Sequence, residues 1–202
     1  MLRQGRTTPA QQRALEQLLP RYGVAFPQPL RSGKPLVLEI GSGMGETTAA
    51  IAQAHPELDF VAVEVHGPGV GSLLNRVESM ALQNLRVVRH DAVEVLERMV
   101  GDETLAGIHL FFPDPWPKKR HHKRRLVQPA FASLMARKLR AGGVLHAATD
   151  WPDYAEHMSV VLSEEPLLQP ADRGLVERPA TKFESRGRRL GHPIRDLFFR
   201  RR

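Results

Sequence analysis

The chain has 202 residues, a formal net charge of +7 and no cysteine. Without cysteine, disulfides, thiolate zinc sites, iron–sulfur clusters and thiol nucleophiles are all excluded. The positive charge is concentrated in residues 118–125 and again from Arg186 to Arg202, which favours a polyanionic partner. No stretch approaches the roughly 18 apolar residues of a membrane span, and the N-terminus lacks a signal-peptide core, so we expect a cytoplasmic protein without a membrane partner.

The apolar pattern predicts a short helix over 9–19, ended by Pro20, and then alternating strands and helices from residue 35. The expected strands are 35–40, 60–65, 85–89, 105–112 and 144–149, and the expected helices are 46–54, 69–83, 92–100, 126–140 and 152–163. Gly142-Gly143 is expected to end the helix before the fifth strand. Weaker strand patterns follow near 172–177 and 194–200.

Continuous apolar strands separated by helices indicate an α/β protein whose parallel sheet carries helices on both faces. No linker or composition shift divides the chain. We therefore expect one domain over 1–202, with an N-terminal extension at 1–34 and a catalytic core at 35–202.

Glycines and acids follow the first three expected strands. The turn L-E-I-G-S-G-M-G at 38–45 has G-x-G-x-G spacing, which differs from the G-x-G-x-x-G of dinucleotide-binding folds. Acids beside such a turn favour a ligand without phosphate, and an acid at the end of the second strand is placed to bind a ribose diol. The candidate cofactor-binding residues at these three ends are Glu39, Gly41, Gly43, Glu64 and Asp91.

The fourth strand leads into F-F-P-D-P-W-P-K-K-R-H-H-K-R-R, where Pro113 ends the strand and places Asp114 at its carboxyl end. The run that follows is too densely charged to pack against a core, and it predicts contacts with nucleic-acid phosphates, although a solvated loop would also fit. Trp116 and Trp151 could stack on an extruded base or simply pack at the rim. The candidate RNA-binding residues are Arg120, His121, His122, Lys123, Arg124 and Arg125.

The glycine turn and the acids at four strand ends together predict the S-adenosylmethionine pocket of class I methyltransferases, since a cationic ligand suits acids. With V-E-V-H-G-P-G-V-G, A-T-D-W-P-D-Y and R-P-A-T-K-F-E-S-R-G-R-R-L-G-H, the chain resembles the bacterial tRNA (guanine-N7)-methyltransferases, the TrmB family, from about residue 35 onward. Gly67 and Arg195 depart from the pattern of that family, at positions away from the candidate site residues.

The resemblance implies a Rossmann-like class I methyltransferase fold with a mostly parallel seven-stranded sheet. It implies S-adenosylmethionine as cofactor, tRNA as partner and N7 of guanine 46 in the variable loop as the methylated atom. Asp114 corresponds to the proposed catalytic residue and also lines the cofactor site. The residues that correspond to substrate contacts are Lys118, Asp150, Thr181, Lys182, Phe183 and Glu184.

Several alternatives stay open at this point. Asp150 could face the guanine in place of Asp114, and the T-x-x-E of residues 181–184 is also an ordinary helix-capping pattern. The chain could instead be an RNA methyltransferase acting on an amino group of adenine or cytosine, or a non-catalytic RNA-binding protein. No histidine spacing suggests a metal site. We expect a monomer or a weak homodimer.

Overall fold

The computed structural model of the chain describes residues 6–179 and 194–202. These described residues form two compact units, one up to Gly101 and one from Asp102 onward. A single domain over the whole chain remains a prediction.

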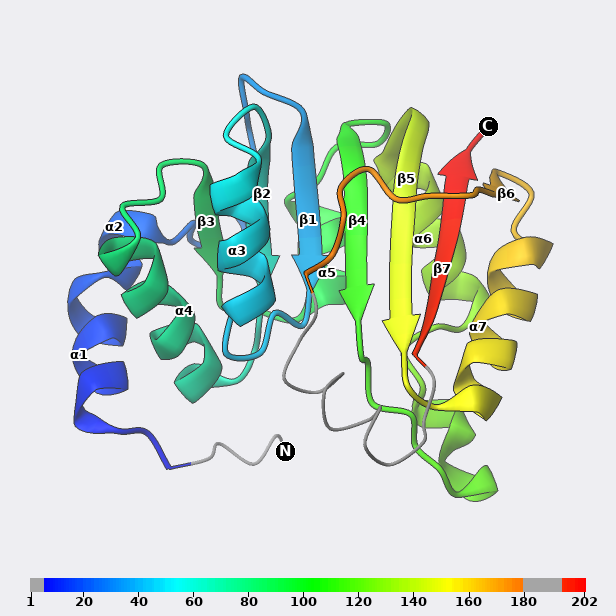
Figure 1. Cartoon of the computed structure of the whole chain (residues 1–202), viewed down its shortest axis with the longest axis horizontal. Coiled ribbons are helices and arrows are strands. Elements are labelled where there is room, and N and C mark those ends of the chain that lie inside the picture. The colour runs from blue at the N-terminus through cyan, green and yellow to red at the C-terminus, as the bar shows by residue number, and fades with distance from the viewer. Residues whose placement is uncertain (1–5, 180–193) are drawn as a thin grey trace. The chain divides into compact units, whose positions relative to one another are not determined.

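The first unit is built on three parallel strands in the order β3-β2-β1. The strands are β1 (Leu36–Ile40), β2 (Asp59–Val63) and β3 (Leu85–Val88), and the helices are α1 (Pro9–Gln17), α2 (Leu19–Tyr22), α3 (Glu46–Ala54), α4 (Gly67–Ser79) and α5 (Ala92–Arg98). Every residue of β1 is buried, as expected for a strand that is covered on both faces. Figure 1 shows α3 in front of these strands and α5 behind them.

The second unit has four strands in the order β4-β5-β7-β6. They are β4 (Leu105–Phe111), β5 (Leu139–Thr149), β6 (Leu168–Pro170) and β7 (Arg195–Arg201), accompanied by the 3-10 helix η1 (Lys119–Arg124), α6 (Pro129–Lys138) and α7 (Pro152–Glu164). β4 and β5 are parallel, whereas β7 runs antiparallel to both of its neighbours. In Figure 1 the segment 171–179 crosses one face of these strands, and α6 and α7 lie on the other face.

The ten strands and helices predicted over 35–163 are confirmed, with ends that differ by a few residues. Three expectations were wrong. Pro20 does not end the helical region, because it occupies the first turn of α2, where proline is tolerated. Gly142-Gly143 does not cap α6, and residues 172–177 do not form a strand.

Gly142 instead lies within β5. Leu139 already has an extended conformation and pairs with Leu105, and the register then shifts before Gly107 pairs with Val144. Gly142 has φ of +75°, which favours glycine, so it accommodates this irregularity in the strand.

Candidate active site

The glycine turn after β1 is held by Glu64 at the carboxyl end of β2. One oxygen of the Glu64 carboxylate accepts the amide proton of Gly43 at 2.8 Å, and the other accepts the amide proton of His66 at 2.8 Å. Gly41 and Gly43 have positive φ, and nothing lies within 4 Å of the position that a Cβ would occupy at either residue. A ligand can therefore approach this backbone closely, and each Glu64 oxygen retains a lone pair for it.

The start of α4 packs against the same turn. A Cβ at Gly69 would lie 2.5 Å from the carbonyl oxygen of Gly43 and 3.5 Å from Cγ of Glu64. Only glycine allows this approach, so α4 fixes both the turn and the acid that binds it.

Glu39 is buried in β1 with 4% of its surface exposed. One carboxylate oxygen accepts a hydrogen bond from the Thr48 hydroxyl at 2.9 Å, and the other has no partner among the described residues. Burial raises the pKa of Glu39 from 4.5 to about 7, while the bond from Thr48 acts in the opposite direction. A cation or a hydrogen-bond donor beside the free oxygen would favour the ionised form.

Asp91 lies immediately before α5 and caps it. Its Oδ1 accepts the amide protons of Val93 at 2.9 Å and Glu94 at 3.3 Å. Asp91 is exposed, so its other oxygen remains available to a ligand at the end of β3. Helix capping and ligand binding are compatible at this position.

In the second unit, Asp114 lies on an exposed loop directly after β4. Phe112 and Trp116 on either side of it have φ of 52° and 44°, a region that residues other than glycine rarely adopt. The amide of Phe112 donates to the carbonyl oxygen of Ala148 at 2.7 Å, which fixes the beginning of the loop to β5. Such conformations often occur at functional sites, where the surrounding structure holds them.

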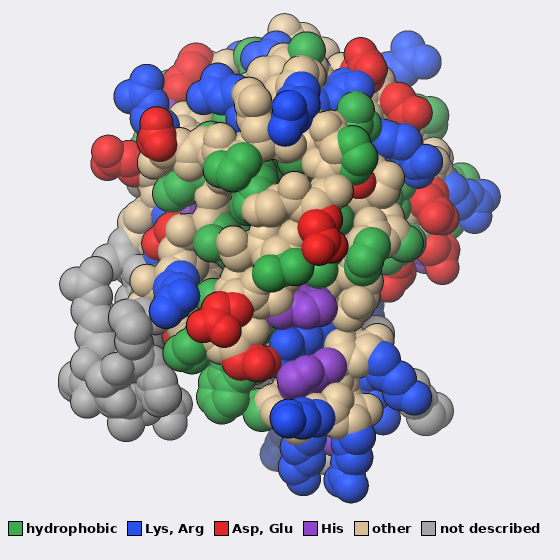
Figure 2. Space-filling model, turned by 90° about the vertical axis from the view of Figure 1, so that its right-hand side faces the viewer, with side chains coloured by type: hydrophobic (Ala, Val, Ile, Leu, Met, Phe, Trp, Pro, Cys, Tyr) green, Lys and Arg blue, Asp and Glu red, His purple; other side chains and the backbone are tan. Residues whose placement is uncertain are grey.

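The basic run after this loop forms η1, and Figure 2 shows its Lys, Arg and His side chains gathered together on one face of the second unit. Its exposed cationic residues are Lys118, Lys119, Arg120, Lys123 and Arg124. The Trp116 ring contacts the guanidinium of Arg124, whose carbon lies 5.0 Å from the ring centre, and the edge of His121. Partial burial, together with the nearby charges of Arg124 and Lys118, lowers the pKa of His121, so this residue favours the neutral form.

Arg125 differs from the rest of the run. Its burial contradicts the prediction that it presents its charge to RNA. Only 3% of its surface is exposed. Its guanidinium donates to the carbonyl oxygen of Pro115 at 2.9 Å and to the carboxylate of Asp153. The run ends where the chain turns inward to Leu126 and Val127, and this turn carries Arg125 into the protein.

Asp150 and Trp151 follow β5 and precede α7, and both are half-buried. The Trp151 amide donates to the Thr149 hydroxyl at 3.2 Å. Asp150 and Asp114 thus follow adjacent parallel strands, β5 and β4, whose carboxyl ends form one edge.

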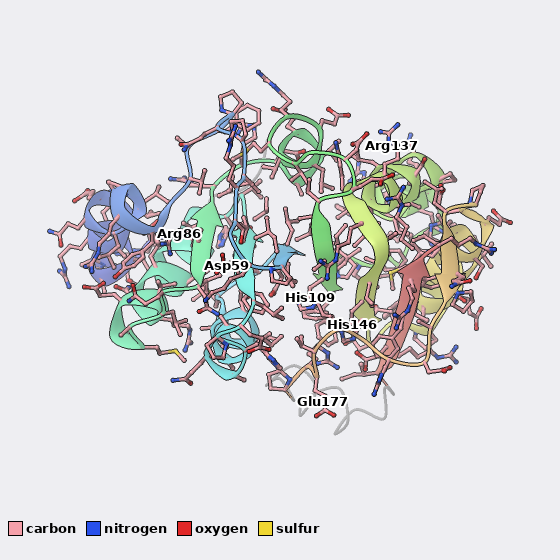
Figure 3. The ribbon with its side chains drawn as sticks, turned by 90° about the horizontal axis from the view of Figure 1, so that it is seen from above. Asp59, Arg86, His109, Arg137, His146 and Glu177 are labelled. Carbon is pink, nitrogen blue, oxygen red and sulfur yellow. The ribbon has the colours of Figure 1, made fainter. Side chains whose placement is uncertain are left out.

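The segment 171–179 covers the face of β4 and β5 that lies opposite α6 and α7 (Figure 1). Figure 3 shows His109 and His146 on these strands, and their ring centres are 6.0 Å apart. His146 contacts Asp196 at 2.7 Å, and Asp196 also pairs with Arg178, whose guanidinium lies over the ring of Phe112 at 5.3 Å. The predicted substrate residues that come next, Thr181, Lys182, Phe183 and Glu184, lie outside the described residues.

The described part of the chain contains neither a candidate metal site nor a candidate membrane-spanning helix. No group of three or more His, Cys, Asp or Glu side chains there could hold a metal ion. Among the helices of residues 6–179 and 194–202, none combines the length and apolar character that a bilayer span requires.

Comparison with known proteins places these features in a family. Residues 33–197 match the family model described as "Putative methyltransferase". A tRNA (guanine-N(7)-)-methyltransferase of Methylobacillus flagellatus is 53% identical over 214 residues, covering 100% of this chain and 90% of the relative. A protein of the same name from Nitrosomonas eutropha is 57% identical over 210 residues, covering 98% and 94%. The chain belongs to the tRNA (guanine-N7)-methyltransferase family.

Solved structures agree with this family at the level of the fold. The 16S rRNA methyltransferase KamB aligns with a TM-score of 0.58 at 18% identity, covering 98% of this chain and 95% of that chain. An rRNA methylase from Streptococcus thermophilus aligns with a TM-score of 0.57 at 12% identity, covering 83% and 87%. The predicted Rossmann-like α/β methyltransferase fold with mostly parallel strands is confirmed.

Within this methyltransferase, each unit brings together part of the predicted site. The first unit gathers the glycine turn and Glu64, with Glu39 in the adjoining strand, and the second gathers Asp114 and the exposed cations. The sequence interpretation missed Asp153 and Tyr154, which contact Arg125 from the first turn of α7. The signal was present in A-T-D-W-P-D-Y, where an acid in a first helical turn could pair with the basic run.

Proposed function

We propose that this protein transfers the methyl group of S-adenosylmethionine to N7 of guanine 46 in the variable loop of cytoplasmic tRNA, acting as a monomer or a weak homodimer. The observation that carries the proposal is the exposed Asp114 loop, whose backbone is held at two left-handed positions directly before a run of exposed cations. The names of the relatives that match the whole chain support tRNA and guanine N7 as the substrate.

The residues of the first unit fit the cofactor. The open backbone at Gly41 and Gly43 admits a ligand, and the lone pairs of Glu64 suit ribose hydroxyls. The unpartnered oxygen of Glu39 suits a cationic group. When bound, S-adenosylmethionine supplies a methyl group activated by its attachment to a sulfonium.

This reaction needs no strong base. The protein has to align the reacting atoms and to stabilise the positive charge that develops on the purine. The in-plane lone pair of guanine N7 forms the new bond to the methyl carbon, the electron pair of the broken bond stays on sulfur, and no proton moves in this step. Positive charge then spreads over the purine, and a carboxylate facing its edge opposes that charge. Asp114 has this role in our proposal, with Asp150 following the adjacent strand and Lys118 at the start of the cationic run that receives the RNA backbone.

Mass spectrometry of nucleosides tests the proposal directly. Unmodified tRNA transcripts carrying G46 or A46 are incubated with the protein and S-adenosylmethionine, then digested. We expect 7-methylguanosine from the G46 transcript and none from the A46 transcript. A methylated adenosine or cytidine, or no product, would overturn the proposal, and product from the A46 transcript would overturn the assignment to position 46.

A further inference from the structure

We propose that Arg125 is a positioning residue for methyl transfer: it holds the Asp114 loop and the first turn of α7 in a fixed relation. The inference rests on the proposed function, because the rate of methyl transfer is the property that depends on the placement of this loop and helix. It assigns to Arg125 a role that differs from RNA contact, although Arg125 ends the most basic stretch of the chain.

The contacts of Arg125 join the two segments directly. Its Nε donates to the carbonyl oxygen of Pro115 at 2.9 Å, and its Nη2 donates to the carboxylate of Asp153. The guanidinium carbon lies 4.9 Å from the centre of the Tyr154 ring. We call these four residues the Arg125 clamp. The side chain of Arg125 is 2% exposed, so bulk water has little access to its guanidinium.

Each end of the Arg125 clamp lies beside a candidate catalytic carboxylate. Pro115 is bonded to Asp114, and Asp153 belongs to the first turn of the helix that follows Asp150. The hydrogen bond from Arg125 lowers the pKa of Asp153, so this partner stays ionised near neutral pH. A shift of Arg125 would therefore move both carboxylates relative to the bound base.

The Asp114 loop needs an external partner of this kind. Its residues Pro113, Pro115 and Pro117 have no amide proton, so the loop cannot hold itself through backbone donors at these positions. The left-handed conformations of Phe112 and Trp116 persist only where neighbouring groups fix them. The Pro115 carbonyl accepts the hydrogen bond from Arg125, at the centre of this loop.

The chemistry of the site requires arginine rather than a cation in general. A planar guanidinium presents donors in fixed directions and can bind a carbonyl, a carboxylate and an aromatic face at the same time. A lysine at this position would keep the charge but could not keep all three contacts. Phosphate binding is disfavoured because the charge is buried and already paired with Asp153.

The test compares Arg125→Lys, Arg125→Gln, Asp153→Asn, the double variant Arg125→Lys/Asp153→Asn and the control Lys138→Met in the full-length protein. Asp153 is 60% exposed, so its substitution opens the clamp without placing a new group in the core. Lys138 is 8% exposed and pairs with Asp102 at 2.7 Å, away from both carboxylates, so it matches the loss of a buried ion pair. The measurements are kcat at saturating tRNA and cofactor, the salt dependence of tRNA binding, melting temperature, and tryptophan emission, which reports on Trp116 and Trp151 alone.

We expect Arg125→Lys and Asp153→Asn to lower kcat by about 10- to 100-fold and to change tryptophan emission, as expected when reacting groups are misplaced. The double variant Arg125→Lys/Asp153→Asn should lose little more kcat than Arg125→Lys alone, and Arg125→Gln, which has no charge, should leave the salt slope of tRNA binding unchanged. Lys138→Met should lower the melting temperature and leave kcat unchanged.

A salt slope lowered by about 0.9 with normal kcat in Arg125→Gln, which removes the charge, would overturn the inference and return Arg125 to RNA contact. A kcat loss equal to that of Lys138→Met would show a merely structural role. If wild type forms no 7-methylguanosine, the proposed function fails, while unchanged emission in the Arg125 variants would refute the clamp by itself.

Discussion

Cofactor binding at pH 6 should release a proton from Glu39. Because burial raises the pKa of this carboxyl to about 7, about 0.9 of it is protonated in the free protein at pH 6 and about 0.1 at pH 8. A cationic group beside the unpartnered oxygen lowers the pKa of a carboxyl by about 1–3. A decrease of about 2 would leave about 0.1 of the bound form protonated at pH 6, so binding should release about 0.8 proton there.

Isothermal titration calorimetry in two buffers of different ionisation enthalpy measures this release. Glu39→Gln is the control, because the amide cannot titrate while the amine of the ligand still can. The difference between wild type and Glu39→Gln should be about 0.8 proton at pH 6 and about 0.1 at pH 8. Equal proton release by both proteins at pH 6 would refute the assignment of Glu39 to the cation.

The same shift has a consequence for stability without cofactor. Because the pKa of Glu39 is raised in the folded protein, its contribution to folding is complete below about pH 4.5 and is lost as the pH rises through about 7. A rise from 4.5 to about 7 corresponds to an upper bound of about 3 kcal/mol. Urea unfolding should show that the stability of wild type relative to Glu39→Gln falls between pH 5 and pH 8, and a constant difference would contradict the raised pKa.

Three further variants test the remaining parts of the site. Glu64→Ala should weaken cofactor binding by about 1–3 kcal/mol, because the amides of Gly43 and His66 lose their acceptor, and unchanged affinity in calorimetry would remove Glu64 from the site. Asp114→Asn should lower the methylation rate by about 10²-fold at an unchanged melting temperature, whereas wild-type turnover would transfer its role to Asp150. Joint replacement of three exposed cations with Ala should lower the log–log salt slope of tRNA binding by about 0.9 for each lost phosphate contact and leave cofactor affinity unchanged. An unchanged slope would mean that this surface is only solvated. The three cations are Arg120, Lys123 and Arg124.

The strands and helices of the core could be predicted because their burial is periodic or continuous along the chain. β1 is buried at all five positions, and its mainly apolar sequence can be recognised without knowing which strands pair with it. The irregularity at Gly142 could not be predicted in this way. A glycine near a helix end indicates a cap unless the pairing of Leu139 with Leu105 is known, and that pairing depends on a strand far away in the sequence.

The positions of Glu64 and Asp114 just after β2 and β4 could be predicted, because each follows the end of an apolar strand. The candidate site could not be predicted within the basic run, where every residue carries the same local signal. Arg125 differs from Arg124 only through its partners, and Asp153 lies 28 residues further along the chain. The burial of one charge among many is decided by such long-range pairing, because an unpaired arginine would remain in water.

The environments of Glu39 and Asp114 suit different tasks in a methyl transfer that needs no base. Glu39 is enclosed, so its charge is unfavourable without a cation beside it, and in our proposal the cofactor supplies that cation. Asp114 lies on an exposed loop, where a base extruded from RNA can reach it, and its position depends on contacts made by the loop rather than on burial. If Glu39 binds the cofactor and Asp114 faces the base, as we propose, the core tunes the first acid, whereas the second needs a contact such as that of the buried guanidinium of Arg125 to hold its loop.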